Sequence, residues 1–337
     1  MVYAEAALMT VLLVTGGMCA LSDCRRGIVP NQYLLIGMGI GLAVHVINLI
    51  IGGAPYYPAW LINMTVADAF AVMMYAEKTW AAGDTKLFML LYFLTPPQLL
   101  DAGTLSYSVI PYIFIFIPAL VYIFLDSLLR LIRHEPQKQP APFSKRSYLS
   151  SIAIIFIETT ALYCIFQRTI SSFFTNNELF ISTLMILYAY FCGTRDVMKK
   201  WYVIVPHSMV VLVFLLLGKW APTIPDWRIY ALLAVVIPLQ RFCVMYNYQQ
   251  IPTAQVKPGM ILSAETIILF SSSRVHHLPH DPSEELTARI NETEAEAVKR
   301  WKGAANGQPN IWIVRKVSFA VMIFLGFILW LTIRIVG

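Results

Sequence analysis

The chain has 337 residues, of which 58% are hydrophobic and 13% are charged, and its formal net charge at neutral pH is +6. A soluble domain carries about 25% charged residues, so this composition excludes a disordered chain and argues against a soluble enzyme. The Lys and Arg residues punctuate apolar runs instead of forming one patch, which argues against nucleic-acid binding. The composition therefore predicts a polytopic α-helical protein in a lipid bilayer.

The first apolar run covers residues 5–22 and is followed by positive charge, at Arg25 and Arg26. A secretory signal peptide has the opposite order, with basic residues before its apolar stretch. By the positive-inside rule, we expect an uncleaved transmembrane helix whose N-terminus lies outside and whose basic end lies in the cytoplasm.

Further apolar runs follow along the chain, and most are long enough to cross a hydrocarbon core of about 30 Å. With the loop after the first run placed inside, most Lys and Arg residues fall on the inner side, which supports ten crossings. We therefore expect an all-α fold with about ten transmembrane helices, near residues 5–22, 32–52, 59–76, 86–101, 108–129, 148–167, 179–193, 202–218, 228–245 and 313–335.

The composition divides the chain into five parts. A first membrane bundle covers residues 1–132, a basic Pro-rich linker covers 133–147, and a second membrane bundle covers 148–245. A polar segment, 246–312, precedes the last transmembrane helix at 313–337. The polar segment predicts a small cytoplasmic lobe, α+β or all-α, that is too short to fold without docking on the membrane bundle.

Within the polar segment, the run Asp281-Pro282-Ser283-Glu284 predicts the start of a helix. Asp281 is a good N-cap residue, proline suits the first helical position, and Glu284 completes the spacing of a capping box. Apolar side chains then recur at helical spacing on one face, at Leu286, Ile290, Ala297 and Trp301.

Two aspartates lie at predicted inner ends of helices, where their flanking residues are distinctive. Asp23 begins the stretch Asp23-Cys24-Arg25-Arg26-Gly27-Ile28-Val29-Pro30-Asn31, and Asp84 lies in Gly83-Asp84-Thr85-Lys86-Leu87. Both carboxyls are expected at the same membrane face. Two carboxyls brought close together share a proton, so that one can activate water while the other polarises a carbonyl group. Gly83 would let backbone approach the reacting group, and Asn31 would cap the second helix after Pro30.

These two stretches resemble the motifs of the type IV prepilin peptidase family of membrane aspartic proteases. Asp23, with Arg25, Arg26, Pro30 and Asn31, resembles the first motif, an aspartate followed by basic residues and then Ile/Val-Pro-Asn. The stretch from Gly83 to Leu87 resembles the second motif, Gly-Asp-x-Lys-Leu, although Ala81 stands where the family has a further glycine.

The resemblance covers roughly residues 5–130 and continues more faintly near the C-terminus. There, Lys257-Pro258-Gly259-Met260, Lys316-Val317-Ser318-Phe319-Ala320 and Gly326 are similar to the tail of archaeal preflagellin (archaellin) peptidases. Residues 131–245 carry no such resemblance.

The resemblance implies a membrane aspartic endopeptidase of the prokaryotic plasma (inner) membrane, with its active site at the cytoplasmic face. Its partner would be a pilin-like precursor, from which it removes a short basic leader ahead of an apolar helix. Asp23 and Asp84 would be catalytic, with neither a metal nor an organic cofactor, while Gly83 and Lys86 support the site. The family's methylating members carry paired C-x-x-C motifs that are missing here, so we expect no N-methylation. The sequence does not assign which aspartate is the base.

Alternative readings start from other titratable residues. Each site aspartate could simply pair with a nearby cation, Asp23 with Arg26 and Asp84 with Lys86. Asp126 is expected to form an ion pair with Arg130 one helical turn later. Two further acids, Asp68 and Glu158, are expected inside the membrane. If the protein were a transporter or a non-catalytic assembly factor, these would be its working residues. Otherwise we expect them to form hydrogen bonds within a bundle or with a neighbouring helix.

A metal site is not expected. His276, His277 and His280 lack a recognised ligand spacing. The five cysteines form no C-x-x-C pair, so neither a zinc ribbon nor a disulfide framework is indicated. Asp196 with the basic residues after it is interpreted as an ordinary helix-end loop. A further rival is a membrane aspartic protease that cuts within helices, since such enzymes share the Gly-Asp feature.

Overall fold

The structure is a computed structural model that covers the whole chain. It describes residues 2–77, 79–100, 105–136, 145–169, 177, 180–185, 201–216, 242–243, 246–284, 288–315 and 317–336.

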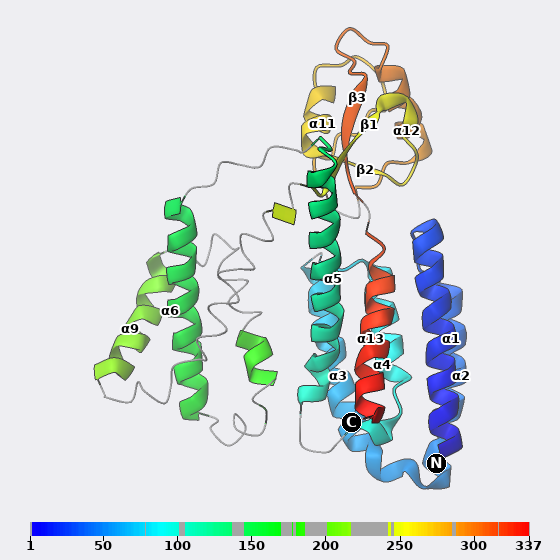
Figure 1. The fold of residues 1–337 in the computed structure, drawn as a ribbon, viewed down its shortest axis with the longest axis vertical. Helices are drawn as coiled ribbons and strands as arrows, with labels where there is room; N and C mark the ends of the chain where they lie inside the picture. Colours follow the sequence, from blue (N-terminus) through cyan, green and yellow to red (C-terminus); the bar gives the residue numbers. More distant parts are fainter. Residues whose placement is uncertain are drawn as a thin grey trace.

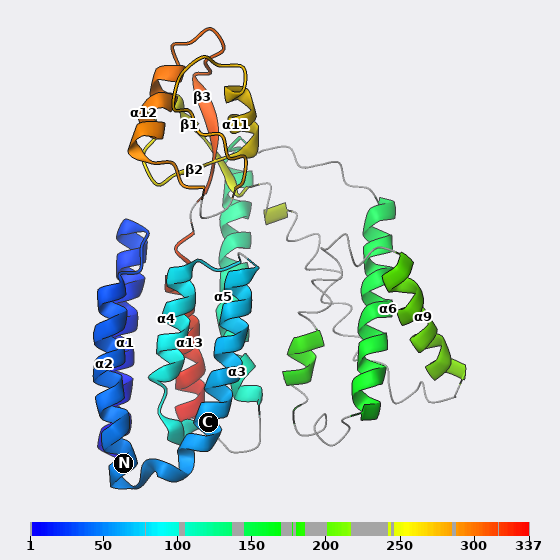
Figure 2. The same cartoon turned by 180° about the vertical axis from the view of Figure 1, so that it is seen from behind.

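The main bundle consists of helices that run alternately along one axis (Figures 1 and 2). Helices α1, α3 and α5 run toward the polar lobe, and α2, α4 and α13 run away from it, so both termini lie at the end opposite the lobe. The helices of this bundle are α1 (Val2–Arg26), α2 (Asn31–Asn48), α3 (Tyr57–Ala76), α4 (Ala82–Phe93), α5 (Ser106–Ile132) and α13 (Phe319–Val336).

Four helical stretches in the described part of the chain are long and apolar enough to cross a membrane: Tyr3–Arg26, Asn31–Ala76, Ser106–Ile132 and Phe319–Val336. The second of these contains both α2 and α3. The protein is thus mainly helical and compatible with a membrane, whereas the full set of ten crossings stays a prediction. The predicted runs 179–193 and 228–245 lie mostly outside the described residues, as does Asp196.

Helices α2 and α4 end before the apolar runs that predicted them, at a glycine in one case and at two prolines in the other. The run predicted at 32–52 is α-helical only to Asn48 and continues as a π turn, in which Gly52 has a φ of 104°. A residue with a side chain rarely adopts this φ, so a glycine allows the chain to reverse toward α3. The run predicted at 86–101 ends its helix at Phe93, because Pro96 and Pro97 cannot continue it.

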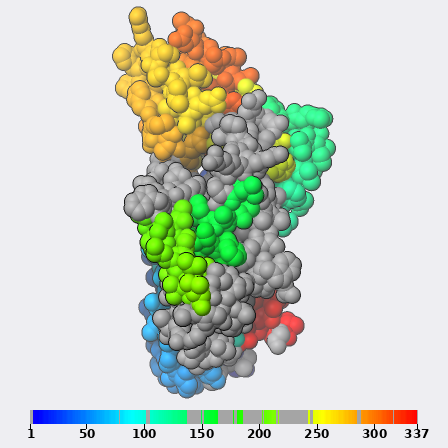
Figure 3. Space-filling model, turned by 90° about the vertical axis from the view of Figure 1, so that its left-hand side faces the viewer, coloured from blue at the N-terminus to red at the C-terminus, as the bar shows by residue number. Residues whose placement is uncertain are grey.

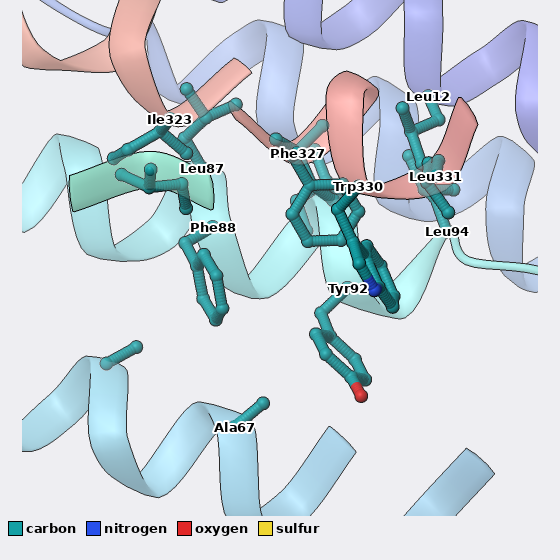
Figure 4. Packing of buried hydrophobic residues seen from close by; sticks show 14 of the residues in the cluster. Leu12, Ala67, Leu87, Phe88, Tyr92, Leu94, Ile323, Phe327, Trp330 and Leu331 are labelled. Atoms are coloured by element: carbon teal, nitrogen blue, oxygen red, sulfur yellow. The ribbon is translucent and has the colours of Figure 1, made fainter. Parts of the chain in front are cut away.

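Helix α13 packs into the middle of the main bundle, against α1, α4 and α5. Figure 4 shows Phe327 and Trp330 of α13 beside Tyr92 of α4, and all three side chains are buried. The rings of Tyr92 and Trp330 are stacked with centroids 6.1 Å apart. At Gly326 the backbone of α13 approaches that of α5 so closely that a Cβ atom would lie 2.4 Å from the carbonyl oxygen of Phe114. The helix that comes last along the chain is therefore a central part of the core.

The polar segment forms a lobe with a small antiparallel sheet in the order β1-β3-β2. The two strands that join the lobe to the bundle are neighbours, with Tyr248 of β1 opposite Val314 of β3. Trp301 is fully buried and packs edge-on against Phe270, with ring centroids 4.8 Å apart. The elements of the lobe are β1 (Tyr248–Pro252), β2 (Ile261–Leu262), α11 (Ala264–Phe270), α12 (Glu292–Trp301) and β3 (Asn310–Val314).

The helix start predicted at Asp281 is wrong. Residues 281–284 are not helical, and α12 begins after Asn291. Asn291 and Glu294 form a reciprocal capping box there: the asparagine side chain accepts from the backbone N–H of Glu294, and the glutamate side chain accepts from that of Asn291. This box satisfies two orphan donors at once and so fixes the start of the helix. Of the predicted apolar face, Ala297 and Trp301 are buried on α12, whereas Ile290 is buried but precedes the helix, and Leu286 lies outside the described residues.

The last apolar run also begins differently from the prediction at residue 313. Its first residues belong to β3, which pairs with both β1 and β2, and α13 starts only at Phe319. The lobe therefore contains a sheet, so the fold is not wholly α-helical.

Helices α6 (Lys145–Thr169) and α9 (Trp201–Leu216) pack against each other beside the main bundle. Figure 3 views the molecule from the side on which they lie, with the lobe above them. They occupy the region predicted as the second membrane bundle.

Candidate aspartate site at the lobe end of the bundle

The two predicted catalytic aspartates lie at the same end of the main bundle. Asp23 is in the last turn of α1 and is 6% exposed, and Asp84 is in the first turn of α4 and is half-buried. This end faces the lobe, whereas the chain termini lie at the other end (Figure 1). Both aspartates therefore lie at one end of the bundle, whereas their placement at one membrane face stays a prediction.

The residues flanking the two aspartates are in direct contact. Nζ of Lys86 donates a hydrogen bond of 3.2 Å to Oδ1 of Asn31, across 55 positions of sequence. A Cβ atom at Gly83 would lie 3.1 Å from Cβ of Val29, so the first turn of α4 lies close against this loop. The structure thus brings the motif of α4 onto the loop that follows Asp23, and glycine permits the close approach.

The loop after Asp23 is shaped by Gly27 and Pro30. Gly27 has a φ of 71°, and its N–H donates to the carbonyl oxygen of Asp23 at 2.8 Å. A left-handed residue that bonds back in this way is a common end of an α-helix, and glycine adopts it without strain. Pro30 is extended and leads directly into α2. The chain therefore reverses tightly, and the side chains of Arg25 and Arg26 are exposed beside the site.

Lys86 and Asn31 differ from two expectations, in which Lys86 pairs with Asp84 and Asn31 caps the second helix. Nζ of Lys86 donates its hydrogen bond to Asn31, whereas the simplest alternative paired Lys86 with Asp84. Asn31 is the first residue of α2, and no side chain caps this helix, so its predicted capping role is wrong. The asparagine side chain instead joins the two motifs.

Trp80 was not recognised from the sequence as part of this site. It is 1% exposed and precedes α4, four positions before Asp84. Its ring is stacked on that of Tyr112 in α5, with ring centroids 5.5 Å apart, and it also packs on the ring of Phe319 in α13, with centroids 5.9 Å apart. The segment that carries Asp84 is therefore supported by an aromatic cluster, for which a bulky residue beside the motif was the only signal in the sequence.

Neither Ser318 nor Arg315 was assigned to this site from the sequence, although Ser318 lies in one of the C-terminal stretches singled out there. Oγ of Ser318 donates to the carbonyl oxygen of Asp23 at 3.4 Å, across 295 positions. Nη1 of Arg315 lies 2.6 Å from Oδ2 of Asp126. Such long-range contacts leave no periodic pattern in a sequence.

The remaining acids have partners or surroundings of their own. The predicted ion pair between Asp126 and Arg130 is confirmed, at 3.0 Å. Glu158 is completely buried and pairs with Nδ1 of His207 on the neighbouring helix α9 at 2.7 Å. Oδ1 of Asp68 is buried without a hydrogen-bond partner among the described residues.

No group of three or more His, Cys, Asp or Glu side chains in the described part of the chain could hold a metal ion. His276, His277 and His280 are all exposed, and His277 has a φ of 68° within a turn. The described side chains at the lobe end of the bundle include the two carboxyls, with basic and amide neighbours.

Comparisons with protein-family models, with curated proteins and with solved structures found no match to this chain.

Proposed function

We propose that the chain is a membrane aspartic endopeptidase in which Asp23 and Asp84 activate a water molecule for peptide hydrolysis. The observation that supports this most directly is the contact between the two motifs, in which Lys86 bonds to Asn31 and Gly83 lies on Val29. This contact joins the first turn of α4 to the loop that follows Asp23.

The proposed chemistry needs one proton shared by two carboxyl groups. Like charges held close together cannot both persist at low cost, so one carboxyl is ionised and the other is protonated. The ionised carboxylate removes a proton from water as the water oxygen attacks the peptide carbonyl carbon, and the protonated carboxyl donates a hydrogen bond to the carbonyl oxygen. Proton transfer to the departing amine completes the cleavage. Either aspartate could be the base.

The resemblance to type IV prepilin peptidases supplies the proposed substrate. We infer that the enzyme removes the short basic leader of a pilin-like precursor at the cytoplasmic face of a prokaryotic plasma membrane, and that it does not methylate the product. In this orientation the N-terminus lies outside, and Arg25 and Arg26 lie inside beside Asp23, as the positive-inside rule favours.

The test is cleavage of purified pilin-like precursors by the purified protein in lipid vesicles, followed by N-terminal sequencing of the product. We expect Asp23→Asn and Asp84→Asn each to lower the cleavage rate by about 10²–10⁴-fold without a change in thermal stability. Asp281→Asn is the matched control, because Asp281 is an exposed lobe residue. Substantial cleavage by either site variant would refute the mechanism. A cut within the apolar helix, away from the leader, would favour the intramembrane-cleaving protease instead.

One observation favours a second candidate, a proton-coupled transporter. The fully buried Glu158 and its partner His207 join α6 to α9, and paired ionisable residues inside a membrane often belong to proton or ion pathways. The peptidase proposal predicts that Glu158→Gln retains cleavage. Proton flux through vesicles that is lost in Glu158→Gln, together with no cleavage by the wild-type protein, would favour the transporter.

A further inference from the structure

The lobe joins the main bundle through two neighbouring segments of the described chain. Strands β1 and β3 are neighbours, and the N–H of Arg315 donates to the carbonyl oxygen of Asn247 at 2.9 Å, just beyond the last strand pair. The segment that enters the lobe and the segment that leaves it therefore run side by side. We call the segment Arg315–Phe319, which leaves the lobe, the connector; its residue Lys316 lies outside the described residues.

The start of the connector is bonded to α5. Nη1 of Arg315 donates to Oδ2 of Asp126 at 2.6 Å and to the carbonyl oxygen of Tyr246 at 3.1 Å. Arg130 donates to the same carboxylate oxygen at 3.0 Å. The side chains of Arg315 and Asp126 are 16% and 26% exposed, so this charge-assisted pair is partly shielded from water. Helix α5 reaches farther toward the lobe than its neighbours do (Figure 1), which places its end beside the connector.

The end of the connector contacts both segments that carry the aspartates. Ser318 donates to the carbonyl oxygen of Asp23 in α1. The next residue, Phe319, packs on Trp80, which lies just before the turn that carries Asp84. Two consecutive residues thus contact the two halves of the candidate site, from a segment whose start is bonded to α5.

We propose that Arg315 is a positioning residue for the peptidase: by bonding to Asp126 it fixes the connector, and the connector sets the spacing between the segments of Asp23 and Asp84. This inference rests on the proposed function. The lobe is then part of the active-site framework, because its exit chain joins α5, α1 and the start of α4. Catalysis by two carboxyls and one water depends on their spacing, and a misplacement of 1 Å can cost about a hundredfold in rate.

The chain offers a matched pair of variants. Arg315→Gln removes the bond between Asp126 and the connector, whereas Arg130→Gln removes the other arginine from the same carboxylate and leaves the connector bonded. Arg315→Lys keeps a positive charge beside Asp126. Both kcat and KM would be measured on a pilin-like precursor with the full-length protein in vesicles.

A second measurement does not depend on activity. Spin labels on the exposed Cys24 and on Ala82→Cys, an exposed position two residues before Asp84, report the separation of the two segments by pulsed electron paramagnetic resonance. All other cysteines would be replaced by serine.

We expect Arg315→Gln to lower kcat by about tenfold or more, with KM changed less than twofold, and to broaden or shift the label distance. Arg130→Gln should change neither, and Arg315→Lys should restore most of both. If Arg315→Gln does not fold, Ser318→Ala should shift the label distance in the same sense. An unchanged distance in Arg315→Gln, or equal effects of Arg315→Gln and Arg130→Gln, would overturn the inference whatever the activity. Absence of cleavage by the wild type would instead overturn the proposed function.

Discussion

Replacing Gly326 by alanine tests whether α13 is locked into the main bundle by close backbone contact. The added Cβ would lie 2.4 Å from the carbonyl oxygen of Phe114 and 2.7 Å from Cα of Ile115, whereas ordinary contact begins at 3.4 Å. The neighbours are backbone atoms of α5 that cannot rotate away, so the two helices must separate by roughly 1 Å, the difference between 3.4 and 2.4 Å.

That separation would loosen the aromatic packing of Phe327 and Trp330, both buried in the core. Overpacking of this kind costs about 1–3 kcal/mol, and we expect Gly326→Ala to lower the free energy of unfolding by this amount. Gly39→Ala is the matched control, because nothing lies within 4 Å of its Cβ position. Alanine favours a helix over glycine, so the control should be neutral or stabilised by up to about 1 kcal/mol.

The assay is reversible unfolding of both variants in mixed detergent micelles, followed by circular dichroism. If Gly326→Ala unfolds at the same denaturant concentration as Gly39→Ala, the close packing of α13 on α5 is not what stabilises the bundle. A loss well above 3 kcal/mol would mean that α13 leaves the bundle altogether, and the exposure of Trp330 to an aqueous fluorescence quencher would reveal this.

Three further predictions concern the aspartate site and the lobe. Lys86→Met and Asn31→Ala should each slow precursor cleavage several-fold, and the double variant should be no slower than the worse single one, because both remove the same hydrogen bond. Gly83→Ala should slow cleavage less than either aspartate variant does, since the facing valine must give way by only a few tenths of an ångström, and alanine in place of that valine should restore the rate. In the lobe, burial and then the hydrogen bond to Glu284 raise the pKa of Tyr248 well above its usual value. Because the folded-state pKa is raised, the protonated tyrosine stabilises the fold fully below the unfolded pKa of about 10, and this contribution is lost as the pH rises above that value. Urea unfolding followed between pH 9 and 11 should therefore be less pH-dependent in Tyr248→Phe than in the wild type.

The sequence predicted the helices of the main bundle well, because an apolar run is a local signal that burial in lipid or in a core reinforces. It predicted the start of α12 wrongly, because the pattern at Asp281 resembles a capping box, whereas the carboxylate of Glu284 accepts from Tyr248 and from the N–H of Ala264. The reciprocal box forms instead at Asn291 and Glu294. Residues 313 and 314 were assigned to a helix because they are apolar, but they pair with β1, and strand pairing depends on a partner far away in sequence.

The site shows the same division between local and long-range information. The motifs around Asp23 and Asp84 were recognisable, and the alternation of helices predicted that they share one end of the bundle. The bond between Arg315 and Asp126 spans 189 positions and involves two ordinary charged residues, so nothing in the sequence marks it. The contact of Ser318 with Asp23 depends in turn on where the lobe returns the chain.

The central place of α13 also has a consequence for biosynthesis. This helix fills the space between α1, α4 and α5, but the ribosome makes it only after the linker, α6, α9 and the whole lobe. Until then, the nascent first five helices lack the helix that fills the space between them, including the buried side chain of Phe327. A chain stalled within the lobe would lack both Ser318 and α13, so translation itself delays the maturation of the aspartate-bearing bundle until the lobe has been completed.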